Sequence, residues 1–492
     1  MSFMVRQWAQ PTKFADALAL EALERVLPHA LIQAAAVGAV HPTQRRRKLP
    51  ADVTLLLCVA MSLFTQQALE VVLDKMVHGL RLFWPDPDIV PANKSAISQA
   101  RYRVGARPVV ALFHRVCRPL ATEQTPGAFR FGLRLLAIDG TTEDVPDSPA
   151  NARAFGRHHS DRGASAFPQV QGVYLSECGT HAVLDAGFWP CHTSERVGAF
   201  RLLRSVGAGM LLLLDRGFHS CEMIERTRAR GAHVLGRVPA GVTLAPRQVL
   251  PDGSYWTYIY PADTARRARG DHLLVRVIVY TLTDPARPGY GETHRLVTTL
   301  LDAREAPALD LICAYHERWE IELTIDEIDI HQRLVQHPLR SQKPVGVLQE
   351  LYSLLLAHYA VRAIMAEAAA QAGLAPTRLS FVQAVELIRV ALDDFHLVAP
   401  CHHPHLYQRL LRDLAACRLP ERAARTNPRH VKRKMSKFKL KRGSPSPASQ
   451  HLAAFQTAIH ILPQARLAQH TLDLPQPADI PLDLPSLLPC PI

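Results

Sequence analysis

The fold is decided by residues 210–218, which read MLLLLDRGF. The apolar run Met210–Leu214 predicts a short buried strand, and it ends at a carboxylate, Asp215. A second apolar run, Leu133–Ile138, ends in the same way at Asp139. Because ligands bind at the carboxyl ends of strands in open α/β sheets, the two aspartates could approach each other there. An acid at a strand end is also a common way for a chain to leave a sheet, so either residue alone would mean little.

The segments around these runs predict a sheet with intervening helices. Turn residues separate the β-rich runs, and Ser194 is typical of a helix N-cap. The predicted strands cover residues 133–138, 169–175, 181–188, 210–214 and 233–238, and the helices about residues 194–206 and 220–230. Three strands, a helix, a strand, a helix and a strand is the order of a ribonuclease H-like core. We therefore predict the α/β fold class.

A strongly charged stretch at residues 314–333, AYHERWEIELTIDEIDIHQR, predicts a helix with a third carboxylate. Arg318 and Glu322 fall at +3 and +7 from Tyr315, which places the three side chains on one helical face. Packed against the sheet, this face could meet the two aspartates. The spacing is equally compatible with a solvated acidic helix, because other acids lie on the same stretch: Glu317, Glu320, Asp326 and Glu327.

Three converging carboxylates would repel one another and would need a cation. Asp139, Asp215 and Glu322 offer hard oxygen ligands, which select Mg²⁺ or Mn²⁺. Two such ions roughly 3.5–4 Å apart suit phosphodiester chemistry. Arg318 could then clamp a phosphate, and Tyr315 could hydrogen-bond one.

Three further features admit a plain structural interpretation. Glu143, Asp144 and Asp147 are rival acids to Asp139, but we expect them on the exit loop of the first strand. Trp256 could stack on an unpaired base, although such a residue is more often the core of a small sheet. Residues 401–405, CHHPH, resemble a fragment of a zinc site; a loop is favoured because no second paired motif lies nearby.

The charge balance favours a polyanion as partner. The 492 residues include 57 Lys plus Arg and 44 Asp plus Glu, which gives a net charge of +13. The densest basic run, residues 429–442, contains Lys432, Arg433 and Lys434, which could hold a DNA backbone. The alternative is a solvated charge run.

A short helix predicted near residues 93–103 is a candidate DNA reader. Arg101 and Arg103 lie there among other polar side chains that suit base edges and phosphates, as in helix-turn-helix proteins. An ordinary exposed helix fits the same residues.

Several classes of protein are disfavoured. No Gly-rich GxxxxGK[ST] loop occurs, so we expect no ATP requirement. The longest mainly apolar run, Thr54–Phe64, is shorter than the roughly 18 residues that span a bilayer, so we expect no membrane partner. The nine cysteines show no paired spacing, which fits a reducing compartment. The expected location is therefore the cytoplasm.

At these residues the sequence resembles the insertion element 4 (IS-4-like) family of DDE transposases. The helix at residues 314–333 is similar to the family signature Tyr-x2-Arg-x3-Glu-x6-Lys. Residues 215–218, DRGF, resemble the family's second-aspartate motif, and residues 138–141, IDGT, its first. The resemblance covers roughly residues 20–442.

The resemblance implies a ribonuclease H-like fold in which Asp139, Asp215 and Glu322 are catalytic ligands of two Mg²⁺ or Mn²⁺ ions. It also implies cut-and-paste transposition of a bacterial insertion sequence. A DNA-bound homodimer would cleave double-stranded DNA at the terminal inverted repeats and transfer the freed 3′-hydroxyl into target DNA.

One residue departs from the signature. Asp329 stands where the family pattern has a lysine, so an anion replaces a cation expected near DNA. Lys343 or Arg333 could substitute for that lysine. The alternatives to an active transposase are a catalytically impaired DNA-binding relic and a metal-dependent nuclease of the same fold.

The order of helical, β-rich and basic segments along the chain predicts a ribonuclease H-like catalytic core with a β-rich insertion, a helical N-terminal domain and a basic C-terminal region. The expected segments are a helical DNA-binding domain at 1–126, the first part of the core at 127–238, the insertion at 239–300, the last part of the core with the catalytic helix at 301–375, and a helical region with the basic segment and a Pro-rich tail at 376–492.

Overall fold

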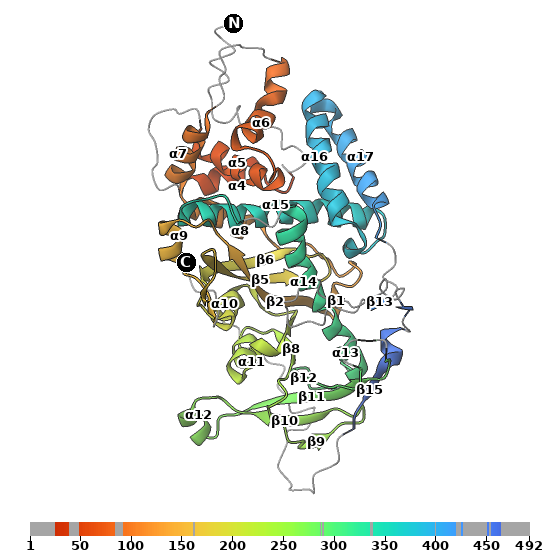
Figure 1. Ribbon diagram of the computed structural model, residues 1–492. Helices are drawn as coiled ribbons and strands as arrows, with labels where there is room; N and C mark the ends of the chain where they lie inside the picture. The colour runs from red at the N-terminus through yellow and green to blue at the C-terminus, as the bar shows by residue number, and fades with distance from the viewer. Residues whose placement is uncertain are drawn as a thin grey trace, which may run out of the picture. The chain divides into compact units, whose positions relative to one another are not determined.

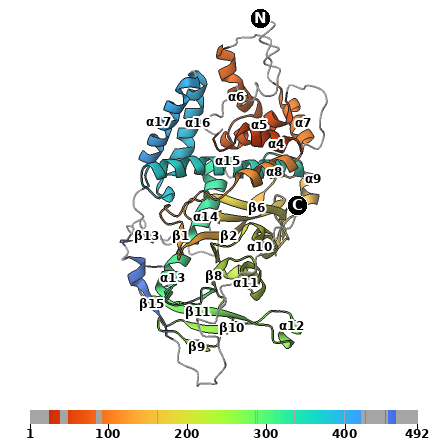
Figure 2. The ribbon, with the colours of Figure 1, turned by 180° about the vertical axis from the view of Figure 1, so that it is seen from behind.

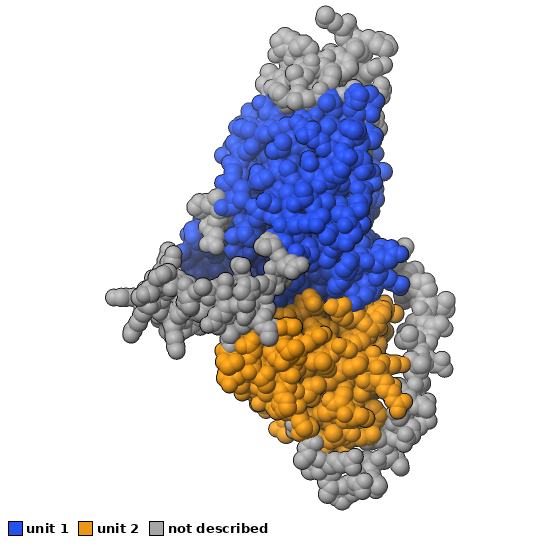
Figure 3. All heavy atoms as spheres, turned by 90° about the vertical axis from the view of Figure 1, so that its right-hand side faces the viewer, with its two compact units in different colours: residues 1–129, 135–205, 319–419 blue, residues 130–134, 206–318, 420–492 orange. Residues whose placement is uncertain are grey.

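The computed structural model describes eleven stretches of the chain. They are residues 25–38, 49–83, 92–160, 163–285, 287, 290–334, 338–398, 400–419, 425–426, 450–451 and 454–463. The predicted DNA-binding residues Lys432, Arg433 and Lys434 lie outside them. Two compact units form, coloured separately in Figure 3: unit 1 comprises residues 1–129, 135–205 and 319–419, and unit 2 residues 130–134, 206–318 and 420–492.

Along the chain, the core elements follow the predicted order (Figure 1). They are β2 (Leu133–Asp144), β5 (Gln169–Glu177), β6 (Val183–Pro190), α10 (Glu195–Leu202), β7 (Met210–Leu214), α11 (Cys221–Arg228) and β8 (His233–Arg237). Ser194 caps α10 by accepting a hydrogen bond from the Arg196 N–H, as expected. The mixed α/β fold class is therefore confirmed.

In unit 1, β6, β5 and β2 pair side by side in antiparallel fashion. The first predicted strand is longer than expected. It does not end at Asp139, because β5 continues to pair with it as far as the Gln169–Asp144 partners. Glu143 and Asp144 are thus part of β2 and not of an exit loop, which corrects the sequence prediction.

The N-terminal part of unit 1 is helical, as predicted. Its helices are α4 (His29–Ala36), α5 (Ala51–Leu63), α6 (Leu69–Phe83), α7 (Lys94–Val104) and α8 (Arg107–Val116). The apolar α5 is buried from Asp52 to Leu63, because α4, α6, α7 and a later helix, α15 (Pro344–Gln371), all pack on it.

The later helices of unit 1 include the predicted catalytic helix. They are α9 (Pro149–Phe155), α14 (Trp319–Asp326), α15, α16 (Phe381–Leu397) and α17 (His403–Ala416). A π-helical segment, Glu327–Gln332, continues α14. Figures 1 and 2 both show α15 between the N-terminal helices and strands β5 and β6.

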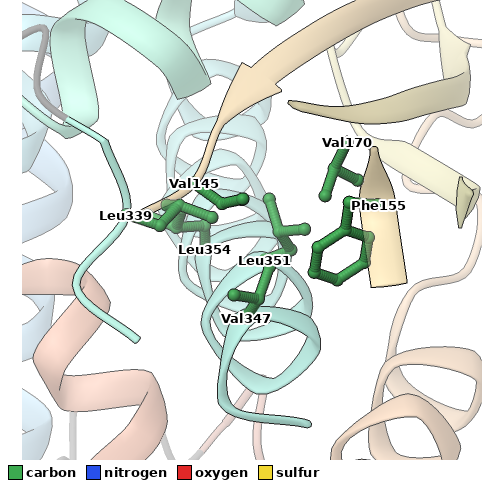
Figure 4. Packing of buried hydrophobic residues seen from close by; sticks show 7 residues of the cluster. All are labelled: Val145, Phe155, Val170, Leu339, Val347, Leu351 and Leu354. Carbon is green, nitrogen blue, oxygen red and sulfur yellow. The ribbon is translucent and has the colours of Figure 1, made fainter. Parts of the chain in front are cut away.

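An apolar cluster joins α15 to the sheet of unit 1 (Figure 4). Val347, Leu351 and Leu354 of α15 pack with residues from β5, α9, the segment after β2 and the segment before α15: Val170, Phe155, Val145 and Leu339. All seven are at least nine-tenths buried, so the cluster fixes α15 against the strand that carries Asp139.

Unit 2 contains β7 and β8, which pair in parallel, and a set of antiparallel strands. β12 (Thr293–Thr298) pairs with β8, and β11 (Leu273–Leu282), β10 (Tyr255–Ile259) and β9 (Gln248–Val249) follow in that order. Trp256 on β10 is 3% exposed, and its indole N–H donates to the Leu301 carbonyl at 3.0 Å. Its role is therefore that of a core residue of this sheet.

Within the described part of the chain, no helix is both long and apolar enough to cross a membrane.

We expect Leu351→Ala to lower the free energy of unfolding by about 2–5 kcal/mol, because it leaves a cavity in the cluster under α15. Urea unfolding followed by circular dichroism measures the change. Val345→Ala on the same helix is the matched control, since Val345 is 40% exposed and should change stability by less than about 0.5 kcal/mol. Equal effects of the two variants would contradict this account of the core.

Candidate active site

Asp139 lies half-buried on β2, on the face opposite to its neighbour Gly140. Its Oδ1 accepts the Gly140 N–H at 2.8 Å. A Cβ at Gly140 would lie 2.9 Å from the Glu195 carboxyl, so a larger residue there would require the Glu195 side chain to move. Because side chains alternate along a strand, Asp139, Thr141 and Glu143 share one face of β2.

The segment that follows the catalytic helix contacts this same face. Thr141 donates its hydroxyl to Asp329 Oδ2 at 3.5 Å, and the Asp329 carboxyl also hydrogen-bonds Glu143. Burial, together with the Glu143 charge, raises the pKa of Asp329 well above its ordinary value. Asp329 is therefore not the simple anion that the sequence suggested.

Neither predicted substitute for the signature lysine is an isolated cation. Arg333 donates to Glu143 Oε2 at 2.6 Å, so its positive charge is neutralised by that carboxylate in an ion pair. The Lys343 ammonium lies 4.6 Å from the centroid of the Tyr102 ring, a cation–π distance.

A buried ionic network holds the catalytic helix. The His181 ring bridges Glu320 at 2.6 Å and Glu327 at 2.9 Å. Glu327 also accepts hydrogen bonds from Arg362 Nε at 2.9 Å and from His358 at 3.1 Å. Burial would raise the pKa of Glu327, but the Arg362 charge and the two histidines hold it well below its ordinary value.

This network separates Glu322 from the rival acids of its helix. Glu320 and Glu327 are buried and engaged, whereas Asp326 is a half-exposed partner of His331 at 3.1 Å. Glu322 is half-buried and lies roughly 200° around α14 from Glu320, at about 100° per residue. Its side chain therefore leaves α14 on the side opposite to that of Glu320.

In unit 2, an acid and an arginine stand level with each other at the carboxyl ends of two parallel strands. β7 and β8 pair as far as Leu214 and Gly236, so the next residues on each strand are Asp215 and Arg237. Asp215 is half-buried, and Arg216 beside it is exposed. The strand-end rule that singled out Asp215 would also have found Arg237, which the sequence prediction missed.

Tyr315 and Arg318 lie at this same edge of unit 2. The Tyr315 hydroxyl is buried, and it has no hydrogen-bond partner among the described residues. Burial raises the pKa of Tyr315 strongly and the Asp215 charge adds to the effect, while Arg318 and Arg237 oppose it. Because buried hydroxyls are normally paired, this donor is available to an acceptor oxygen of a bound ligand.

Arg216 and Arg237 also line a cavity of about 280 Å³ with Arg295. Arg295 is engaged with the chain, since it donates to the carbonyls of Pro239, Ala240 and Val242. The Arg237 guanidinium contacts His294 Nδ1 at 3.1 Å. The cavity wall thus carries excess positive charge, which suits a phosphate.

The predicted DNA-reading helix exists as α7, capped by Asn93. Arg101 does not lie on its outer surface, because its guanidinium is buried and hydrogen-bonded to Gln349, Ser341 and Gly346. Arg103 is half-buried.

The three candidate metal ligands are all half-buried carboxylates, a donor set that fits Mg²⁺ or Mn²⁺. Asp139 and Glu322 belong to unit 1 and Asp215 to unit 2. Within either unit, the described residues include no group of three or more His, Cys, Asp or Glu side chains that could hold a metal ion. Residues 401–405 form a short 3₁₀ turn and the start of α17, where a loop was favoured.

Two family models match the chain. One described as insertion element 4 transposase N-terminal covers residues 17–114, and one described as transposase DDE domain covers residues 130–359.

Two curated relatives come from Escherichia coli (strain K12). The transposase InsG for insertion sequence element IS4 is 31% identical over 409 residues, which is 80% of this chain and 88% of that protein. The putative transposase InsZ is 29% identical over 225 residues, 45% of this chain and 72% of that protein. A solved piggyBac transposase synaptic complex with hairpin DNA aligns at a TM-score of 0.41 and 13% identity, over 84% of this chain and 86% of that one.

We expect Glu327→Gln to lower the free energy of unfolding by about 3–5 kcal/mol, because it leaves Arg362 buried without its counter-charge. Chemical denaturation measures this change. Asp326→Asn is the matched control on the adjacent position, where the side chain is 42% exposed and a change below about 0.5 kcal/mol is expected. A Glu327→Gln protein as stable as this control would refute the structural role of the network.

We expect Asp329→Asn to gain stability relative to the unaltered protein as pH rises. A carboxyl with a raised folded-state pKa binds more protons folded than unfolded, so its contribution to stability is lost above the unfolded pKa of about 3.9. Asparagine removes that loss. Urea unfolding of both proteins at about pH 5 and about pH 8 should show a difference on the order of 1 kcal/mol that grows with pH. A pH-independent difference would count against the Asp329–Glu143 contact.

Proposed function

Because the chain belongs to the insertion element 4 family of DDE transposases, enzymes that cleave and transfer DNA strands, we propose that it performs cut-and-paste transposition. The family predicted from the motif residues is confirmed, and so is the ribonuclease H-like class of its core. The proposed reaction is cleavage at the terminal inverted repeats of a bacterial insertion sequence, followed by strand transfer into target DNA.

The observation that carries this proposal is the edge of unit 2. The orphan hydroxyl of Tyr315 lies within electrostatic reach of Asp215, Arg237 and Arg318. One carboxylate surrounded by phosphate-binding groups is the arrangement needed where a metal and a phosphodiester meet. We assign the Tyr315 hydroxyl the role of donor to a phosphate oxygen, and Arg318 and Arg237 the neutralisation of its charge.

Members of this family generally use divalent metal ions. We assign Asp139, Asp215 and Glu322 as the residues that would hold two Mg²⁺ or Mn²⁺ ions. When bound, such ions lower the pKa of the attacking hydroxyl and stabilise the leaving oxygen. The chain's own contribution is to hold the acceptor carboxylates half-buried, on strand β2, on helix α14 and directly after strand β7.

The proposed DNA partners follow from charge. Arg103 on α7 would contact the backbone near the element end, and the basic segment with Lys432, Arg433 and Lys434 would bind phosphates without sequence preference. A DNA-bound homodimer would bring the two ends together, and the substrate would place the enzyme at the bacterial nucleoid.

A second candidate function is DNA binding without turnover. One observation favours it: the family lysine is replaced by Asp329. The raised pKa of the Asp329 carboxyl weakens this argument against catalysis, since a neutral carboxyl repels a phosphate far less than a carboxylate does.

The test is cleavage and joining of labelled double-stranded element ends with Mg²⁺ or Mn²⁺. We expect the unaltered protein to release a 3′-hydroxyl and to join it to plasmid DNA. Asp215→Ala should lower cleavage more than about 100-fold, because even the partners of metal ligands are worth 10–100-fold. DNA binding by this variant should stay nearly unchanged.

Three results would contradict the proposal. Cleavage without joining would indicate a nuclease. If the unaltered protein neither cleaves nor joins DNA and Asp329→Lys restores both reactions, the chain is a catalytically impaired transposase. If neither the unaltered protein nor Asp329→Lys cleaves DNA while both still bind it, the function is DNA binding alone.

A further inference from the structure

A cavity of about 200 Å³ lies within unit 1. Its wall comes from α5, α7, α15 and the segment that follows the π-helical turn. The charged side chains on this wall are Arg101, Arg333, Arg340 and Glu350. Three arginines and one glutamate therefore line one small space.

Arg101 is a buried cation without an ionic partner in the described part of the chain. Its side chain is 8% exposed. It donates to Gln349 Oε1 at 3.2 Å, to Ser341 Oγ at 3.1 Å and to the Gly346 carbonyl at 3.1 Å, all of which are neutral acceptors. Burying a charge without a counter-charge is costly, so an anion in the cavity would stabilise this arrangement.

Arg340 adds a second cation to the same wall. Its guanidinium donates to the Gln67 carbonyl at 2.9 Å, and it forms no ion pair among the described residues. Burial lowers the pKa of Arg340, and the nearby Arg101 lowers it further against the opposing effect of Glu350. Arg101 and Arg340 are thus close enough to repel each other.

The two carboxylates near the cavity already have hydrogen-bond or ion-pair partners. Glu350 accepts the Arg340 N–H at 2.9 Å, the Ser341 N–H at 3.2 Å and the Ser341 hydroxyl at 2.9 Å. Glu143 is paired with Arg333. With both carboxylates counted, the cavity keeps an excess positive charge.

We propose that this cavity binds a phosphate group of the DNA backbone. Guanidinium forks match the oxygens of a phosphate, and they bind it with charge-assisted hydrogen bonds. The inference rests on the proposed function, in that DNA is the source of the phosphate. Arg101 belongs to α7 and Arg340 follows the helix of Glu322, so a bound backbone would connect the DNA-reading helix with the catalytic helix.

The first experiment uses inorganic phosphate as the probe, without metal or DNA. We expect phosphate to raise the melting temperature of the full chain in a saturable way, compared with chloride at equal ionic strength. Arg340→Gln should remove at least about half of that rise. The Arg340 guanidinium is partly desolvated, but the residue as a whole is exposed to solvent, so the variant should fold. Arg340→Lys is a second variant that keeps the charge but loses the fork.

The second experiment measures the salt dependence of binding to element-end DNA, again without metal. Each lost phosphate contact lowers the slope of log K against log salt by about 0.9, so Arg340→Gln should flatten it by that amount. Arg409→Gln is the matched control, because this unit 1 arginine lies on α17, outside the cavity, with a side chain 69% exposed. It should leave both the phosphate response and the slope as in the unaltered protein.

Both effects together support the proposal. A phosphate response with an unchanged salt slope would mean a site for a free anion, and it would overturn the assignment to DNA. The absence of both effects would overturn the site itself. Glu322→Gln separates this test from that of catalysis, since it should lose cleavage and keep both the phosphate response and the slope.

Discussion

The buried ion pair of Glu327 with Arg362, reinforced by His181 and His358, is the interaction on which the position of α14 depends. Moving a carboxylate and a guanidinium out of water costs several kcal/mol per ion, and only multiple charge-assisted hydrogen bonds offset that cost. The partners come from the turn before β6, the π-helical segment and α15. His181 even adopts a left-handed backbone, with φ of 60°, to place its ring between two carboxylates.

The π-helical segment has a second consequence for this helix. Its last residue, Gln332, donates to the carbonyls of Ser62 on α5 and Leu354 on α15. The Gln66 side chain donates to the Arg333 carbonyl at 2.7 Å. The end of the catalytic helix is therefore tied to the N-terminal helices as well as to α15. Because packed helices of this kind shift as rigid bodies, a displacement of the N-terminal helices would be transmitted to Glu322.

The predictable part of the structure was the part governed by local pattern. Apolar runs such as Met210–Leu214 became buried strands, because such a run has no polar face to leave in water. Ser194 capped its helix because the capping bond is made within the first turn. The strand end predicted before Asp215 is present, whereas Asp139 lies inside the longer strand β2.

The remainder depended on partners distant in sequence. β2 continues to Asp144 because β5 supplies hydrogen bonds to a polar stretch that would not form a strand alone. Arg101 is buried because Gln349 and Ser341, about 240 positions later, supply neutral acceptors for it. Spacing also could not rank the acids of the catalytic helix, since burial of Glu320 and Glu327 requires His181 and Arg362.

Position 329 shows how a residue's charge depends on its environment. In the sequence, aspartate in place of lysine reverses the sign of a charge expected near DNA. In the structure, the carboxyl of Asp329 meets Thr141 and Glu143, and its raised pKa favours the protonated form. Arg333, four residues later, supplies the positive charge that balances Glu143. The net charge of Asp329, Glu143 and Arg333 is therefore close to zero. The aspartate changes which contact the side chain at position 329 makes, and it changes the electrostatic field at a DNA backbone less.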